Sequence, residues 1–228
     1  MPSIQILEET PHYLALLKPA GMLSQPSEKP SDTPDVLSAL NTLRISPVYP
    51  VHRLDRETAG VMLVALTEPG AAKLSALVSS GGLHKTYLAV VRGRPAEQSA
   101  EWTDLLFRDA RRNKSYVVDR KRAGVKEARL AYDVINTVQT ADGPLSLVRV
   151  RLYTGRTHQI RVQFSHRGLP LVGDGRYGGG GGTLSLFAAR LAFTCPFCGR
   201  EKTFTALPSD GAFTLFDELS SENAANLL

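Results

Sequence analysis

Runs of apolar residues predict a chain of many strands and a few helices. Residues 13–17 and 61–66 are typical of strands, the second of them buried. Further strand patterns occupy residues 4–6, 86–91, 115–118, 128–135, 145–152, 184–193 and 202–206, the last two being strands or a mixture of strand and helix. Because strands and helices do not alternate regularly, the pattern favours an α+β fold over a doubly wound sheet. We expect one domain over residues 1–216 and a frayed tail over 217–228.

Three segments carry helical signals. A first helix begins at residues 33–34, and Thr67 is a suitable N-cap for a second helix, which the glycines at 81–82 end. The expected apolar faces are Val36, Ala39, Leu40 and Leu43 in the first helix and Ala71, Leu74, Leu77 and Val78 in the second. Residues 155–166 are typical of a turn that feeds a third helix. The five glycines at 178–182 predict a flexible loop.

Composition describes an ordinary globular protein of 228 residues, with 43% hydrophobic and 21% charged residues. No apolar run approaches the roughly 20 residues that a membrane-spanning helix needs. The N-terminal segment contains Glu8 and Glu9 and has no basic-then-apolar signal, so we expect no secretion. Two cysteines provide no disulfide framework, which predicts a reducing, cytoplasmic location.

Positive charge is concentrated in one stretch of the chain. The protein carries 27 Lys and Arg against 22 Asp and Glu, a net charge of +5, whereas residues 108–129 carry nine basic and three acidic residues, a net +6. This local excess, the basic strip, attracts a polyanion such as nucleic acid, although a solvated loop has the same composition. Its basic residues are Arg108, Arg111, Arg112, Lys114, Arg120, Lys121, Arg122, Lys126 and Arg129.

Residues 52–60 (HRLDRETAG) are crowded with charge directly before the predicted strand 61–66. Asp55 lies between Arg53 and Arg56, and two guanidinium groups near a carboxylate keep it ionised at neutral pH. An ionised carboxylate suits catalysis, but a structural ion pair at the entrance to a strand explains the same residues. Both interpretations stay open at this point.

Two other segments contain residues suited to chemistry. Tyr87, in residues 85–87 (KTY), lies on a predicted strand and either packs in the core or stacks on a base. In residues 155–161 (GRTHQIR), Thr157 can cap a helix whose first turns carry Arg161. Free backbone N–H groups and two arginines suit a phosphate or a carboxylate there. A plain amphipathic helix is the alternative.

Together and in this order, these segments resemble the RluA family of pseudouridine synthases. Residues 52–60 are similar to the family signature HRLDxxTSG. The resemblance extends to four further motifs: KPAG at 18–21, KTYLA at 85–89, GRTHQIRV at 155–162 and GDGRYG at 173–178. It covers residues 4–216, nearly the whole chain. Ala59, Gln163 and Phe187 depart from the family pattern at positions that shape the fold more than the chemistry.

The resemblance implies the pseudouridine synthase fold, a mixed and mainly antiparallel sheet with flanking helices and loops and an active-site cleft across the sheet. It also implies isomerisation of uridine within ribosomal or transfer RNA. The glycosidic bond breaks, the uracil turns, and its carbon 5 joins the sugar. Because this chemistry is redox-neutral and loses no atoms, we expect no metal and no organic cofactor. The family default is a monomer.

Carried over to this chain, the resemblance implies that Asp55 is the catalytic carboxylate, acting either as nucleophile at the anomeric carbon or as base at the neighbouring carbon. Arg161 is expected to pair with it. Tyr87 is expected to stack on the target uracil and to assist removal of the proton from carbon 5. A base inside a helix must be flipped to be reached, and Arg53 is a candidate to fill its space. His52 is expected to hold the loop's shape.

Other basic residues are expected to grip the RNA. They are Arg53, Arg56, Arg156 and His158 near the motifs and Arg111, Arg112, Lys114, Arg120, Lys121 and Arg122 in the basic strip. Such contacts predict binding that depends strongly on salt.

Cys195 and Cys198, in the segment CPFCG, resemble half of a zinc knuckle. A structural zinc needs four ligands, so histidines or a second subunit would have to complete the site. We prefer a tight turn with two free thiols.

Two other function classes fit parts of the sequence. A non-catalytic RNA-binding module on the same fold is disfavoured because Asp55, Tyr87 and Arg161 are all present. A metal-dependent RNA hydrolase using Asp55, His52 and His158 is disfavoured because the chain offers no acidic cluster to hold magnesium.

Overall fold

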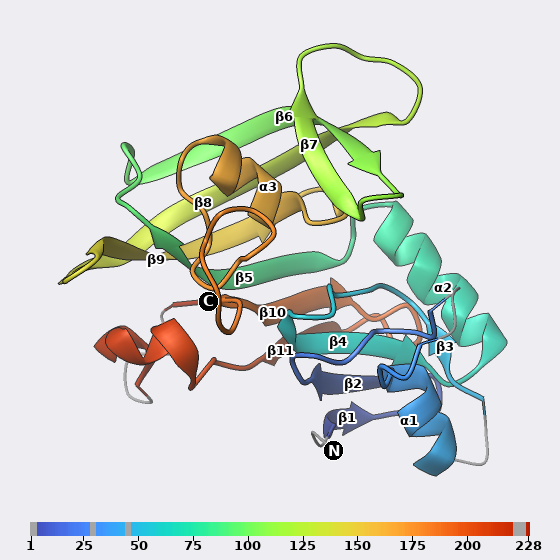
Figure 1. Cartoon of the computed structure of the whole chain (residues 1–228). Helices are drawn as coiled ribbons and strands as arrows, with labels where there is room; N and C mark the ends of the chain where they lie inside the picture. The colour runs from blue at the N-terminus through green and yellow to red at the C-terminus, as the bar shows by residue number, and fades with distance from the viewer. Residues whose placement is uncertain (1–3, 28–30, 44–46, 221–226) are drawn as a thin grey trace. The chain divides into compact units, whose positions relative to one another are not determined.

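The computed structural model describes residues 4–27, 31–43, 47–220 and 227–228. These residues form eleven strands, three α-helices and two short 3₁₀ helices (Figure 1). Strands outnumber helices and do not alternate with them, which confirms the α+β class. The chain folds into two compact units, residues 1–85 with 188–206 and residues 86–187 with 207–228. That residues 1–216 act as one catalytic domain stays a prediction.

The first unit is a sheet with two helices. Its elements are β1 (Gln5–Glu9), β2 (Tyr13–Lys18), α1 (Val36–Leu43), β3 (Tyr49–Pro50), β4 (Ala59–Ala65), α2 (Glu68–Ser79), most of β10 (Leu186–Thr194) and β11 (Glu201–Thr205). The strand order is β1-β2-β4-β10, with β3 beside β4 and β11 beside β10. β2 and β4 are antiparallel, and Lys18 pairs with Gly60 at one end of the ladder. The motifs at 18–21 and 52–60 therefore meet.

Alternate residues of β2 and β4 build the core of the first unit, because successive side chains of a strand point to opposite faces. Helix α2 packs beside them and contacts β3 and β4. Thr67 caps this helix as predicted, and its hydroxyl accepts the N–H of Gly70 at 3.1 Å. The buried core residues are Tyr13, Ala15, Val61, Leu63, Ala65, Leu74, Leu83, Leu191, Phe193 and Cys195.

The second unit is a sheet against which one helix packs. Its elements are most of β5 (His84–Arg92), β6 (Ser99–Asp109), β7 (Lys114–Val118), β8 (Val125–Thr140), β9 (Gly143–Leu152), α3 (Gln159–His166) and the 3₁₀ helices Gly211–Leu215 and Asp217–Leu219. The strand order is β5-β9-β8-β6-β7. Helix α3 contacts β6 and β7. Phe164 of α3 meets Trp102 of β6 edge-on, with ring centroids 4.7 Å apart.

Several elements differ from the sequence prediction. Strand β6 was not predicted, because charged residues on its exposed positions interrupt the apolar pattern. Strands β8 and β9 are longer than expected, since they run together to a two-residue turn, residues 141–142, that joins Thr140 to Gly143. The expected inward face of α1 was wrong at Leu43, which is 78% exposed.

The five glycines lie in a loop, as their composition predicted, but the loop is closely packed at Gly179. Gly179 donates its N–H to Asp174 O at 2.8 Å and accepts the Nε–H of Arg92 on its carbonyl at 3.0 Å. A Cβ on Gly179 would lie 1.6 Å from Leu171 O. Glycine is therefore needed here for close packing of backbone against backbone, and this part of the loop is held in place.

The end of the chain is not simply frayed after residue 216. Asp217–Leu219 forms a 3₁₀ helix, and Glu218 accepts a hydrogen bond from Asn136 Nδ2 at 2.5 Å. Residues 221–226, to which the prediction of fraying also applied, lie outside the described residues. No helix among the described residues is long and apolar enough to cross a membrane.

Candidate active site

Asp55 lies in a loop, residues 52–58, that leads into β4 of the first unit. The loop is anchored at Leu54, whose N–H and carbonyl both bond the hydroxyl of Ser24 at 2.9 Å. The N–H of Thr58 bonds the carbonyl of Asp55 at 3.1 Å and closes a turn. Gly60 follows with φ +121°, and a Cβ there would lie 2.3 Å from Ala188 O. The backbone on both sides of Asp55 is thus fixed, while its side chain is half-buried.

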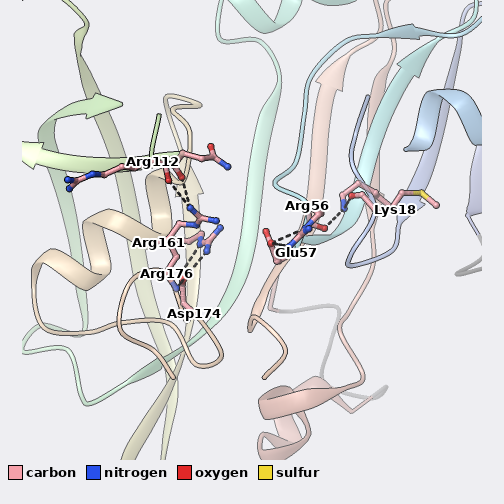
Figure 2. Close-up of polar contacts among 9 residues, drawn as sticks. Lys18, Arg56, Glu57, Arg112, Arg161, Asp174 and Arg176 are labelled. Carbon is pink, nitrogen blue, oxygen red and sulfur yellow. Dashed lines mark hydrogen bonds and ion pairs between the residues drawn. The ribbon is translucent and has the colours of Figure 1, made fainter. Parts of the chain in front are cut away.

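Lys18 clamps the KPAG turn onto this loop. Its buried ammonium donates to Pro19 O at 2.9 Å and to Met22 O at 2.7 Å. It also donates to Arg56 O at 3.1 Å (Figure 2). The carbonyl of Arg56 also accepts the N–H of Gly21 at 2.9 Å. Three backbone carbonyls therefore converge on one lysine: one in the KPAG motif, one directly after it, and one in residues 52–60.

This lysine places a cation near the candidate catalytic carboxylate. Burial lowers the pKa of Lys18 to about 8, and the negative charges of Asp55 and Glu57 oppose that shift. Lys18 is still protonated in most molecules at pH 7, so it places a positive charge near Asp55. Sequence reasoning did not name Lys18 as a site residue, although the KPAG motif contains it.

The two arginines that flank Asp55 are exposed. Arg56 donates from Nε and Nη2 to Glu57 Oε1, at 3.1 and 2.8 Å (Figure 2). An exposed pair of this kind adds little to stability and leaves the guanidinium accessible to solvent. Their expected contact with RNA, and the expected role of Arg53 in base flipping, stay predictions.

His52 ties the loop to strand β4 and does not act as an acid. Its Nε2 accepts the N–H of Leu63, in β4, at 3.0 Å. Burial, assisted by the charge of Lys85, lowers the pKa of His52 to about 3. The ring is therefore neutral at physiological pH, which supports the structural role expected for it.

The pKa of His52 predicts an acid sensitivity of folding. In the unfolded chain this histidine takes up a proton near pH 6.5, whereas in the folded protein it stays neutral down to about pH 3. The unfolded state thus binds more protons between these values, and the free energy of unfolding falls as the pH drops through this window, by at most about 1.4 kcal/mol per pH unit. Urea unfolding at pH 7, 5.5 and 4 measures the free energy of unfolding across this window.

The matched control is His52→Gln, which keeps a hydrogen-bond acceptor for Leu63 but does not titrate. We expect the variant to lose less stability than the wild type between pH 7 and pH 4. Parallel curves for the two proteins would show that His52 does not carry this effect.

In the second unit, Arg161 is held by Asp174 in a buried bidentate pair. Nε donates to Oδ2 at 2.7 Å and Nη2 donates to Oδ1 at 2.8 Å (Figure 2). The two side chains are 5% and 0% exposed. Such a fork fixes the plane of the guanidinium. Sequence reasoning expected Arg161 to pair with Asp55; its described carboxylate partner is Asp174, and pairing with Asp55 stays a prediction.

Asp174 also organises the turn of the GDGRYG motif. Its Oδ1 accepts the N–H groups of Arg176 and Tyr177, each at 3.2 Å. Arg176 in turn donates from Nη1 to the carbonyls of Arg112 and Asn113, at 3.1 and 2.9 Å (Figure 2). One buried carboxylate therefore orients Arg161 and ties the turn to the β6–β7 hairpin. The motif contained this residue, but nothing in the sequence indicated its partner.

The GRTHQIR segment begins its helix differently from the prediction. The N-cap of α3 is His158 in a left-handed conformation, φ +55°, and not Thr157. His158 is 7% exposed, and its Nδ1 lies 3.0 Å from the hydroxyl of Tyr177, which also accepts the N–H of Ser115 at 2.8 Å. His158 thus belongs to a buried hydrogen-bond network, and the contact with RNA expected of it stays a prediction.

Tyr87 lies on β5 and is 6% exposed. A buried tyrosine fits both interpretations of this residue, a core position and a stacking surface for one enclosed base. Its expected catalytic role stays a prediction.

The basic strip is solvent-exposed, as an RNA-binding surface must be. Of its nine basic residues only Lys114 is half-buried, and its ammonium lies 5.1 Å from the centre of the Tyr177 ring. Arg111 and Arg112 occupy the turn between β6 and β7, while residues 120–122 occupy the loop between β7 and β8. Arg156, outside the strip, is exposed and donates from Nε to Glu127 O at 2.8 Å.

Metal ligands do not cluster in the part of the chain that the structure describes, where no group of three or more His, Cys, Asp or Glu residues comes together. Cys195 is buried and Cys198 is exposed, and both are free thiols. The zinc knuckle suggested by CPFCG thus has two of its four ligands among the described residues.

Comparison with known proteins agrees with these motifs. The family model for RNA pseudouridylate synthase matches residues 12–166. Ribosomal large subunit pseudouridine synthase D of Zymomonas mobilis subsp. mobilis is 32% identical, over 91% of this chain and 70% of that protein. tRNA pseudouridine synthase C of Pasteurella multocida is 33% identical, over 90% of this chain and 91% of that protein.

A solved structure has the same fold. Human RNA pseudouridylate synthase domain containing 1 aligns with a TM-score of 0.73 over 95% of this chain and 94% of its own, at 23% identity. The fold and the motifs define a pseudouridine synthase. The chain belongs to the RNA pseudouridylate synthase family, a family of RNA isomerases, and its RluA-type motifs are confirmed by its relatives.

Proposed function

We propose that this protein isomerises specific uridines in ribosomal or transfer RNA to pseudouridine, with Asp55 as the essential carboxylate. The observation that carries the proposal is the Asp55 loop, in which the family signature is anchored by Ser24 and by the clamp of Lys18 on the neighbouring motif. The names of the relatives, which cover both kinds of RNA, support the choice of substrates.

A carboxylate suits either route through this reaction. Breaking the glycosidic bond leaves an oxocarbenium-like sugar, which needs a close negative charge or a covalent trap. As a nucleophile, Asp55 forms a bond to the anomeric carbon; as a base, it removes the proton from the neighbouring carbon. Both routes require that Asp55 is ionised, and the structure places the positive charge of Lys18 near it.

Arg161 and Tyr87 take the supporting roles in the proposal. The guanidinium of Arg161, held in one plane by Asp174, pairs with Asp55 and keeps it ionised. Tyr87 stacks on the uracil and assists removal of the proton from carbon 5. Full turnover by an Arg161→Ala variant that remains folded would contradict the first of these roles.

Tritium release tests the reaction. The purified protein, without added metal, is incubated with transfer and ribosomal RNA transcripts tritiated at carbon 5 of uridine. Release of tritium is expected from one of these RNAs, unchanged by a chelator, and chemical mapping then locates the position. Tight binding without release would favour a non-catalytic module on this fold. Chain cleavage that stops on chelation would favour the hydrolase.

The basic strip predicts how binding depends on salt. Replacing Arg120, Lys121 and Arg122 by alanine is expected to weaken binding to every RNA sequence and to flatten the plot of log affinity against log salt by about 0.7 for each phosphate that these side chains neutralise. Filter binding between about 50 and 200 mM salt measures both effects. Lys73→Ala, an exposed lysine outside the strip, is the control. Equal salt slopes for the triple variant and the wild type would remove this loop from the interface.

A further inference from the structure

The hairpin between β10 and β11 brings two thiols together. The N–H of Gly199 bonds the carbonyl of Cys195 at 2.8 Å, and the N–H of Cys195 bonds the carbonyl of Arg200 at 2.8 Å. Gly199 has φ +70°, which lets the chain reverse directly after Cys198. The turn thus places both cysteines within one reversal of the chain, three residues apart.

Packing fixes this turn from outside. Phe197, between the two cysteines, stacks on His12 with ring centroids 4.1 Å apart and an interplanar angle of 12°. The ammonium of Lys73 lies 5.3 Å from the centre of the same ring. Two side chains from other parts of the first unit therefore stabilise the turn that carries the two cysteines.

The two thiols have unequal surroundings. Cys198 is exposed, whereas Cys195 is 3% exposed and belongs to the core. Cys198 accepts the N–H of Arg200, and the charges of Arg200 and Lys202 are close to it. Together with the hydrogen bond from Cys195, these groups lower the pKa of the Cys198 thiol. An accessible, activated sulfur beside a shielded one is the arrangement of attacking and resolving thiols.

We propose that Cys195 and Cys198 form a redox-active dithiol, in which Cys198 reacts with a peroxide and Cys195 then closes an intrachain disulfide. A metal site is the less well supported interpretation of the same two cysteines. Two thiolates supply half of a tetrahedral site, and the described residues provide no third ligand beside them. The proposal does not rest on the pseudouridine synthase activity.

The chemistry balances with hydrogen peroxide as the oxidant. The Cys198 thiolate attacks the O–O bond, a sulfur–oxygen bond forms, and hydroxide leaves. The sulfur of Cys195 then attacks the sulfenic sulfur of Cys198, the sulfur–sulfur bond forms, and the sulfur–oxygen bond breaks with release of water. In sum, two thiols and one peroxide give one disulfide and two waters, so the sulfurs are oxidised and the peroxide is reduced.

The test uses the full chain, reduced and then freed of reductant, with one equivalent of hydrogen peroxide. These are the two cysteines of the sequence, so peptide mass and thiol titration report on them alone. We expect the peptide containing residues 195–198 to lose two hydrogen atoms, both thiols to disappear together, and dithiothreitol to restore them. Both thiols surviving, or one thiol passing to sulfinic acid without a disulfide, would overturn the proposal.

Two serine variants assign the roles. In Cys195→Ser the sulfenic acid of Cys198 should persist and be trapped by dimedone. In Cys198→Ser the buried Cys195 should react at least about tenfold more slowly than Cys198 does. Equal rates would contradict the assigned order. If Cys195→Ser unfolds the protein, the peptide map of the wild-type protein still shows whether the disulfide forms. A parallel sample contains zinc chloride. If zinc protects both thiols from oxidation and joins two chains, the two cysteines form a shared metal site and not a redox-active dithiol.

Discussion

Replacing Asp55 by asparagine is expected to lower the rate of tritium release from carbon 5 of uridine by at least on the order of 10⁴-fold, as loss of a catalytic nucleophile or base does in other enzymes. The change keeps the size of the side chain and removes its negative charge. Without that charge, nothing at this position can trap or stabilise the oxocarbenium-like sugar, or remove a proton from it. Single-turnover assays with excess enzyme measure the effect on the chemical step.

The control for this variant is Asp32→Asn, the same chemical change at an exposed carboxylate of the first unit. It should leave the rate unchanged. Both variants should bind RNA and unfold near the wild-type temperature, because backbone groups of Leu54 and Thr58 hold the loop around Asp55. Tritium release by Asp55→Asn at the wild-type rate would keep the function and reject Asp55 as the catalytic group.

Replacing Asp174 by alanine is expected to destabilise the protein by about 3–5 kcal/mol, because it leaves the charge of Arg161 buried without its carboxylate. The same change removes the acceptor for the N–H groups of Arg176 and Tyr177. Denaturant unfolding measures the loss of stability. Asp174→Asn, which keeps one acceptor oxygen, should cost less.

A matched control exists in the same unit. Glu101 accepts Arg129 Nε at 2.5 Å, but the two side chains are 44% and 48% exposed, so Glu101→Ala should destabilise the protein much less than Asp174→Ala. Equal destabilisation by Asp174→Ala and Glu101→Ala would show that burial of the Arg161 pair does not matter. In a folded Asp174→Asn protein, turnover should fall more than RNA affinity, since Arg161 is oriented by this carboxylate.

Local signals in the sequence determined much of the fold. Strand β4 and helix α2 were predicted because a continuous apolar run and a capped 3.6-residue period each depend on neighbours in the chain. The ordered motifs likewise indicated the family, because each motif is a short run of consecutive residues that the sequence displays directly. Local signals failed in β6, because its charged residues obscure the alternation of apolar and polar positions that marks a strand.

The tertiary structure alone decided which groups meet. Lys18 bonds the carbonyl of Arg56, which is 38 residues away in the sequence, and Arg161 bonds Asp174, which is 13 residues away. His158 is 7% exposed and its Nδ1 lies 3.0 Å from the hydroxyl of Tyr177, a partner that the motif did not indicate. Composition predicted a flexible loop at Gly179, where backbone packing requires glycine. A residue's type states what it can bond, whereas its partner and its exposure to water depend on chain segments brought together only by folding.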